Sequence, residues 1–197
     1  MGTRGTGTIE RLVSGSVSEE VARIAPCSTL VLRGGEEAWP PRTVVVGDDF
    51  SGEAEWAGEL AARIGGLFDA SALLVLGFPS PGVYSHAETS RVRASKSMFG
   101  DGGELLRRRA VRLGSLLTER PAIKVSAGDA AIIIRETAAE SEKPTLVAVG
   151  SRGLDALRRL ALGSVSTDIL RTASGPVLVF PSAAKDREAH QSRSAVE

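Results

Sequence analysis

The sequence has little of several things that would place it in a special class of protein. Its 197 residues include one cysteine, Cys27, which excludes a disulfide framework and a metal site built from cysteines. The 24 basic and 24 acidic side chains cancel, so the chain lacks the positive surplus that nucleic-acid binding needs. The longest apolar run, residues 72–78, is too short to span a bilayer, and no signal-peptide pattern opens the chain. We therefore predict a cytoplasmic protein that binds neither membranes nor nucleic acids.

The chain repeats part of its own sequence. Residues 2–32 align without a gap with residues 150–180, and 13 of the 31 positions are identical. Three glycines stay in register, which chance similarity between helical segments rarely preserves, because glycine is unfavourable in a helix. We predict four parts: the last helix and strand of a truncated first repeat at 1–33, a linker at 34–42, a complete domain at 43–181 and a flexible polar tail at 182–197.

Strand patterns and helix patterns alternate along the complete domain. Short apolar runs predict strands at residues 43–47, 72–78, 121–126, 145–149 and 176–180. Apolar residues at three- and four-residue spacing predict helices at residues 51–68, 105–117, 129–141 and 164–172. Ser51 and Asp129 are placed to cap two of these helices, and Ile123 and Val125 would share the buried face of the third strand. The mostly continuous apolar strands favour an α/β fold with a doubly wound parallel sheet.

A glycine motif follows the fourth of these strands. It reads Gly150-x2-Gly153-x9-Gly163-Ser164 and stands where doubly wound sheets bind ligands, outside the carboxyl ends of the strands. Glycines let the backbone approach a ligand closely, and the first amides of a helix that opens at Gly163 favour an anion. Ser164 and Ser166 add hydroxyl donors. The motif predicts a di- or triphosphate site without a lysine, and the other interpretation is a tight strand end followed by a helix cap.

Together these pieces resemble the universal stress protein family over residues 42–181. The glycine motif matches that family's nucleotide-binding signature in full. VVVGDDFS at residues 44–51 is similar to the family's first strand, commonly VVVGVDGS, and KPTLVAVGSRG at residues 143–153 resembles its fourth strand and turn. The resemblance implies a Rossmann-like, open, five-stranded parallel sheet in the order 3-2-1-4-5, usually in a dimer.

The resemblance also implies a ligand and the residues that hold it. Many members of the family bind ATP and hydrolyse it slowly or not at all, and here ATP would carry Mg or Mn on its phosphates. In those members an Asp after the first strand contacts the nucleotide, and Asp49 has that position. The other positions that the resemblance assigns to the site are Gly77, Phe78, Val149, Gly150, Gly153, Gly163, Ser164, Val165 and Ser166.

Two residues depart from the family's pattern beside this Asp. Phe50 stands where the family usually has Gly, and Asp48 stands where it has Val. The Phe50 ring would either crowd the ribose pocket or fold outward. The neighbouring carboxylates of Asp48 and Asp49 would repel phosphate unless a metal bridges them.

Three hypotheses for function follow. The first is a stress-response module that binds ATP or a related adenine nucleotide and signals or scaffolds as a dimer. The second is a nucleotide-free dimerisation scaffold in which Phe50 fills the pocket. The third is a slow ATPase, for which Asp48 and Asp49 are the only evident general bases. We expect no dedicated catalytic residue.

The truncated repeat predicts how the chain associates. It keeps Gly2, Gly5, Gly15 and Ser16, which form the phosphate half of the motif, but it has no first strand, so we expect no second complete site. Its strand at residues 29–33 would be an exposed apolar edge. We predict that it pairs with the last strand, Val177–Phe180, of the same chain or of a partner, and that a homodimer forms through one or both strands.

The remaining polar residues are given ordinary structural interpretations. Arg107, Arg108, Arg109 and Arg112 are interpreted as the solvated face of a helix. His86 and His190 are interpreted as exposed to solvent, and Cys27 as packed rather than reactive.

Overall fold

The computed structural model describes residues 15–78, 102–151 and 162–181 of the chain. The strands are β1 (Thr29–Val31), β2 (Thr43–Gly47), β3 (Ser71–Phe78), β4 (Ala122–Ala127), β5 (Thr145–Gly150) and β6 (Val177–Phe180). The helices are α1 (Gly15–Ile24), the single 3-10 turn η1 (Glu36–Ala38), α2 (Gly52–Gly66), α4 (Gly103–Gly114), α5 (Ala130–Glu140) and α6 (Ser164–Thr172). No helix in these described ranges is long and apolar enough to cross a membrane.

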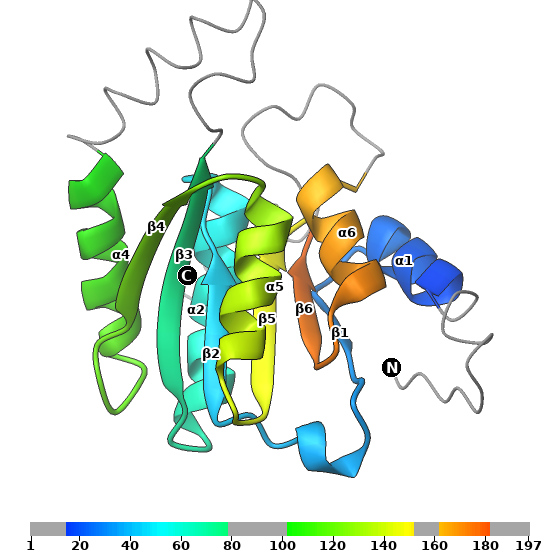
Figure 1. The fold of residues 1–197 in the computed structure, drawn as a ribbon, viewed down its shortest axis with the longest axis horizontal. Helices are drawn as coiled ribbons and strands as arrows, with labels where there is room; N and C mark the ends of the chain where they lie inside the picture. The colour runs from blue at the N-terminus through cyan, green and yellow to red at the C-terminus, as the bar shows by residue number, and fades with distance from the viewer. Residues whose placement is uncertain (1–14, 79–101, 152–161, 182–197) are drawn as a thin grey trace, which may run out of the picture.

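The strands form one sheet in the order β1-β6-β5-β2-β3-β4. Strands β2 to β6 run parallel, which confirms the five-stranded order predicted from the sequence, and β1 adds a sixth strand in the antiparallel direction (Figure 1). From β2 the chain builds outward through β3 and β4, and then returns to the other side of β2 for β5 and β6. The strand order therefore reverses between β2 and β5, and ligands of such sheets bind at this point.

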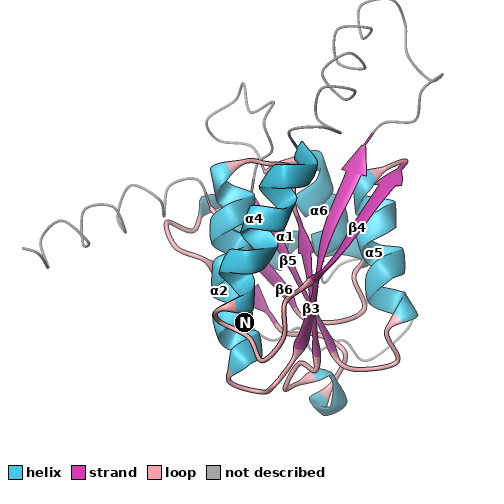
Figure 2. Ribbon diagram, turned by 90° about the vertical axis from the view of Figure 1, so that its left-hand side faces the viewer, coloured by secondary structure: helices cyan, strands magenta, loops and turns pink. Residues whose placement is uncertain are grey.

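Helices cover both faces of the sheet. α2 and α4 lie on one face and α5 and α6 on the other (Figure 2), with α1 beside α6 (Figure 1). The central strand β2 is buried on both sides: Val44 and Val46 pack on the α2 face, and Val45 packs on the α5 and α6 face. This burial is the reason that β2 reads as a continuous apolar run rather than an alternating one.

The predicted caps of α2 and α5 and the predicted start of α6 are confirmed, whereas α4 spans Gly103–Gly114 instead of the predicted 105–117. Ser51 caps α2, since its Oγ accepts a hydrogen bond from the Ala54 amide at 3.1 Å. Asp129 caps α5, since its Oδ1 accepts from the amides of Ala131 at 2.9 Å and Ile132 at 3.1 Å. The bounds of α6 are those predicted from the sequence.

The prediction that Ile123 and Val125 lie on the buried face of β4 is wrong. These side chains are 39% and 41% exposed, whereas Lys124 points toward α5 and forms an ion pair with Glu140 at 2.8 Å. The physical reason is the position of α4, whose buried side packs on β3 and leaves this face of the edge strand β4 open. Cys27, expected to be packed, is also exposed.

The N-terminal segment joins the sheet of its own chain. β1 pairs with the free edge of β6, and α1 packs beside α6. A two-pronged ion pair fixes the two helices, because Glu19 accepts from Arg171 Nε at 2.8 Å and from Arg171 Nη2 at 2.9 Å. Both edges of β6 are therefore occupied, one by β5 and the other by β1.

Candidate functional site

The candidate site lies at the carboxyl ends of β2 and β5, where the strand order reverses. β2 ends at Gly47 and leads into the turn that carries Asp49, and β5 ends at Gly150 and leads into the glycine motif. The start of α6 returns to the same edge after that motif. Gly153 belongs to the segment 152–161, which lies outside the described residues, so its predicted role stays a prediction.

The two ends of the glycine motif are fastened together. The carbonyl oxygen of Ser151 accepts hydrogen bonds from the Gly163 amide at 2.7 Å and from the Ser166 Oγ at 3.1 Å. Ser166 is only 1% exposed, and its hydroxyl also faces the Gly163 carbonyl at 3.0 Å. Its single proton is shared between two backbone carbonyls, so Ser166 closes the base of the motif instead of offering a donor to a phosphate.

The start of α6 lacks a side-chain cap among the described residues. Gly163 is the N-cap residue, with extended backbone angles, and it has no side chain to accept from the first amides. Thr167 donates the first backbone hydrogen bond of the helix, to the Gly163 carbonyl at 2.9 Å. Ser164, one residue into the helix, is exposed. α2 and α5 also begin at this edge of the sheet, but the side chain of Ser51 caps α2 and that of Asp129 caps α5.

Gly150 serves packing within the protein. A Cβ placed there would lie 2.8 Å from the Cβ of Glu53 and 2.9 Å from the amide nitrogen of Ala54. The missing side chain therefore lets the end of β5 approach the first turn of α2. Gly77 does the same for β3, because its Cβ would lie 2.6 Å from the Cα of Ala130 at the start of α5.

The other predicted site residues lie at the ends of β3 and β5 and in the first turn of α6. The side chain of Val149 is buried in the core, and that of Val165 packs against the same apolar cluster beneath α5 and α6. The Phe78 carbonyl accepts from the Gly128 amide at 2.7 Å, which joins the end of β3 to the loop after β4. The Val149 side chain is therefore turned away from a ligand, whereas those of Val165 and Phe78 are half-buried.

The turn after β2 is held by hydrogen bonds from several directions. Asp49 Oδ1 accepts from the Ser51 amide at 3.0 Å, and Asp48 Oδ1 accepts from the Phe50 amide at 2.8 Å. Asp48 is 3% exposed and forms an ion pair with Arg109, which is 7% exposed and projects from α4. Arg109 Nη2 also donates to the carbonyls of Phe50 at 3.2 Å and Ser51 at 3.1 Å. The Asp48 charge is thus compensated inside the protein.

This geometry decides two questions that the sequence raised. Phe50 packs against the cluster that contains Leu74, Leu76 and Leu106, on the α4 face, whereas α6 lies on the opposite face. Its ring therefore folds away from α6. Asp48 is enclosed by its ion pair with Arg109, so it is not placed to act as a general base toward a ligand.

Arg109 is the residue that the sequence interpretation missed. The helix was expected to present a solvated basic face, and Arg107 and Arg108 do lie in solvent. Arg109, however, stands between Leu106 and Leu113, at the spacing of the buried stripe of α4. Apolar periodicity could have placed it on the buried face, but only the fold supplies its partner.

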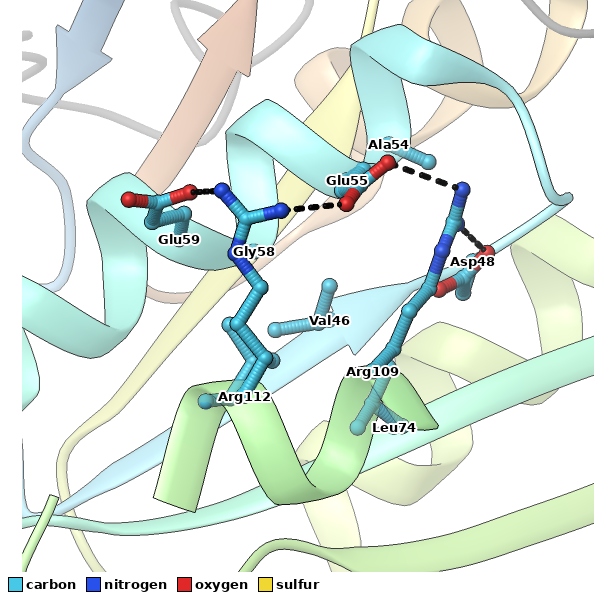
Figure 3. Close-up of a pocket in the computed structure, with 10 residues that line it drawn as sticks. Val46, Asp48, Ala54, Glu55, Gly58, Glu59, Leu74, Arg109 and Arg112 are labelled. Atoms are coloured by element: carbon cyan, nitrogen blue, oxygen red, sulfur yellow. Dashed lines mark hydrogen bonds and ion pairs between the residues drawn. The ribbon is translucent and has the colours of Figure 1, made fainter. Parts of the chain in front are cut away.

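An ion-pair network extends from Arg109 along the interface of α2 and α4. Arg112 donates to Glu55 at 2.8 Å and to Glu59 at 2.7 Å, and Glu55 also lies 3.5 Å from Arg109 (Figure 3). The cavity that these side chains line has a volume of only about 10 Å³. That is room for about one water molecule and excludes a nucleotide.

A larger depression lies at the opposite edge of the sheet, where the strands begin. Its volume is about 550 Å³, and its lining mixes basic Arg42 and Lys143 with acidic Asp69 and Glu119. The mixed charges give it no preference for an anion. Within the described ranges, no group of three His, Cys, Asp or Glu side chains could hold a metal ion.

Comparison with known proteins places these features in a family. The profile of the Universal stress protein family matches residues 1–33 and 41–181. A universal stress protein from Mycolicibacterium smegmatis (strain ATCC 700084 / mc(2)155) is 49% identical over 53 residues, which are 27% of this chain and 17% of the relative. The matched stretch thus covers less than a fifth of the length of that relative.

Solved structures share the fold at low sequence identity. A functionally unknown protein from Pseudomonas aeruginosa PAO1 superposes on 98% of this chain and 66% of its own, with a TM-score of 0.66 and 17% identity. A universal stress protein solved in complex with cAMP superposes on 71% of this chain and 97% of its own, with a TM-score of 0.53 and 23% identity.

Proposed function

Because the chain belongs to the universal stress protein family, we propose that it is a stress-response module that binds an adenine nucleotide at the carboxyl edge of its sheet. The phosphates would lie at the start of α6, and Asp49 would accept hydrogen bonds from the ribose hydroxyls. ATP is the proposed ligand, with Mg or Mn carried on its phosphates rather than in a protein cage. The structure of a relative with cAMP supports an adenine nucleotide as the class of ligand.

The observation that carries this proposal is the uncapped start of α6. The first turn of a helix has unpaired amides and the positive end of the helix dipole. α2 and α5 satisfy these amides with Ser51 and Asp129, but Gly163 has no side chain that could do so. The exposed Ser164 adds a hydroxyl beside them. A phosphate is the complementary group for this arrangement.

The surroundings of the turn after β2 support the same function. Two ionised carboxylates side by side would repel a polyphosphate, but the Arg109 guanidinium neutralises Asp48. Asp49 then keeps its charge as an acceptor at the strand reversal. The Phe50 ring packs on the α4 face, which gives no support to a scaffold whose pocket Phe50 fills.

Substitution of Gly163 tests the proposal sharply. Asp at the N-cap of α6 would satisfy the helix amides and add a favourable charge–dipole interaction, raising stability by up to about 1 kcal/mol. The same carboxylate would stand where the phosphate binds, so ATP affinity should fall. Gly163→Asp should therefore raise the melting temperature of the free protein and lower the affinity for Mg-ATP measured by calorimetry.

Gly163→Asn is the matched control, since it caps the helix without a charge. We expect it to stabilise the free protein to a similar degree and to weaken ATP less than Asp does. At a ligand concentration of 100 times Kd, ATP should stabilise the wild-type protein by about 2.7 kcal/mol. Absence of any thermal shift with Mg-ATP, or equal ATP binding by the wild type and Gly163→Asp, contradicts the proposal.

We also propose that the chain self-associates, as the sequence predicts, through the last strand, through β1 or through both. Both edges of β6 are paired within the chain, so a contact through Val177–Phe180 would first require β1 to leave. Light scattering across a range of protein concentrations tests this proposal, and a monomer at every concentration contradicts it.

A further inference from the structure

Arg109 meets the turn after β2 at three points. It forms the ion pair with Asp48 (Figure 3), and its Nη2 also donates to the carbonyls of Phe50 and Ser51. The contacts come from α4, which lies 58 to 61 residues further along the chain. An arginine can hold several acceptors at fixed angles because its guanidinium group is planar and always charged.

The turn that Arg109 holds has a backbone conformation that needs support. Phe50 has φ 68°, in the left-handed region that is unfavourable for a residue with a Cβ. Such a residue persists only where its surroundings determine the conformation, and these residues gather at functional sites. The Phe50 amide donates to Asp48, and the Phe50 carbonyl accepts from Arg109. The two members of one ion pair therefore hold the backbone on both sides of the Phe50 Cα.

We infer that Arg109, through its ion pair with Asp48, is a positioning residue that fixes the turn and orients the Asp49 carboxylate toward the nucleotide. The inference rests on the proposed function for its ligand. Arg109 itself touches no ligand atom in this role. It acts through the turn, whose next amide, that of Ser51, donates to Asp49 Oδ1 at 3.0 Å.

Burial makes a simple test ambiguous, and a paired substitution resolves it. Asp48→Val or Arg109→Met alone leaves a buried charge without its partner, and such proteins lose much of their stability. The double variant Asp48→Val/Arg109→Met removes both charges and fills the space with apolar groups, one of them the residue usual in the family. Replacing a buried ion pair in this way is often neutral for stability. The double variant should therefore recover most of the stability that each single variant loses.

The double variant should still lose the contacts by which Arg109 holds the turn after β2. We expect the Ser51 amide, followed by NMR hydrogen exchange in the ligand-free protein, to exchange at least about tenfold faster than in the wild type. We also expect Mg-ATP affinity, measured by calorimetry, to fall about tenfold or more. Arg109→Lys should keep the ion pair but hold the two carbonyls less well, giving an intermediate exchange rate and affinity.

Arg112→Met is the matched control. Arg112 lies one turn further along α4, and its ion pairs with Glu55 and Glu59 touch no atom of the turn. We expect it to change neither the Ser51 exchange rate nor the ATP affinity by more than about threefold, because the Arg112 side chain is 53% exposed and its ion pairs are screened by solvent.

The outcomes separate this inference from the proposed function. Wild-type exchange at Ser51 in the recovered double variant overturns the positioning role, whatever the ATP result. Wild-type ATP affinity in that variant overturns it as well. If the wild-type protein binds no ATP but Ser51 exchange accelerates as expected, the proposed function fails while the role of Arg109 in fixing the turn stands.

Discussion

Leu30 and Leu178 lie directly opposite each other in the antiparallel pair of β1 and β6. They also occupy the same position in the two aligned segments of the sequence, 148 residues apart. On either side the pairing crosses over: Thr29 pairs with Val179 and Val31 with Val177, whereas the alignment equates Thr29 with Val177 and Val31 with Val179. A local two-fold axis therefore passes between the two leucines, as at the interface of a symmetric dimer.

The helices above these strands break that symmetry. Arg171 of α6 pairs with Glu19 of α1. By the same alignment the counterpart of Glu19 is Thr167, so a second copy of β6 and α6 in place of β1 and α1 would offer Arg171 no carboxylate there. The ion pair thus favours the segment of the same chain as the partner of β6.

Disulfide trapping tests this pairing. Leu30→Cys/Leu178→Cys, made together with Cys27→Ser, places two thiols at opposed positions, where Cα atoms lie about 4.5 to 5.5 Å apart. We expect mild oxidation to give a crosslink within one chain, seen on a non-reducing gel as a monomer of altered mobility. Thr29→Cys/Leu178→Cys is the control, because neighbouring residues of a strand face opposite sides of the sheet, and it should crosslink far more slowly. A disulfide-linked dimer as the main product contradicts the intrachain pairing.

The left-handed conformation of Phe50 gives an unusual order of stability for two substitutions. Phe50→Gly and Phe50→Ala both lose the ring, but only Ala keeps the Cβ that is unfavourable at φ 68°. We expect Phe50→Gly to be more stable than Phe50→Ala by about 1 kcal/mol in urea denaturation.

Phe68 supplies the comparison for this prediction, since it is not among the residues with positive φ in the described part of the chain. At Phe68 the order should reverse, because Gly adds freedom to the unfolded chain without relieving strain. The same order at both positions would show that the Phe50 backbone angle contributes nothing.

The close packing at Gly150 predicts that a single methyl group disturbs the site. Gly150→Ala would push a Cβ against Glu53 and Ala54 at the start of α2, which should destabilise the protein by about 1 to 3 kcal/mol. Gly103→Ala is the control in α4, where the nearest described atom to the added Cβ is Arg107 Nη1, at 3.9 Å. It should stabilise the helix by up to about 1 kcal/mol. Guanidinium denaturation of both variants measures these opposite changes.

Ser164 and Ser166 should separate ligand binding from stability. Ser166→Ala removes the buried hydroxyl that bonds the Ser151 and Gly163 carbonyls, at a cost of about 1 kcal/mol. Ser164→Ala removes an exposed hydroxyl beside the open amides, so we expect little change in stability and a weaker affinity for Mg-ATP. Melting curves and calorimetry on the two variants check the assignment, and an unaltered affinity in Ser164→Ala argues against a phosphate contact there.

Much of the fold could be predicted from the sequence because local patterns and chain order agree. Continuous apolar strands alternating with amphipathic helices leave few arrangements other than a doubly wound parallel sheet. The caps Ser51 and Asp129 stand directly before the helices that they begin, so sequence alone finds them. The start of α6 is equally clear from Gly163.

The features that escaped the sequence depend on contacts between distant segments. Alternation shows that Ile123 and Val125 share a face of β4, but it cannot show that α4 leaves this face open. Arg109 lies on the buried stripe of α4, yet its partner Asp48 is 61 residues away. Gly150 must lack a side chain because the first turn of α2 packs against it. The spacing of glycines in the motif does not reveal this neighbour.

The pairing of the first described strand with the last has a consequence for the order of folding. Among the described strands β1 pairs with β6 alone, so this pairing can form only after the chain has been built through to β6. Closing so long a loop carries an entropic penalty that local turns avoid. We expect β1 to join late during refolding and to open early under mild denaturant, with its amides exchanging before those of β2 while the five parallel strands stay intact.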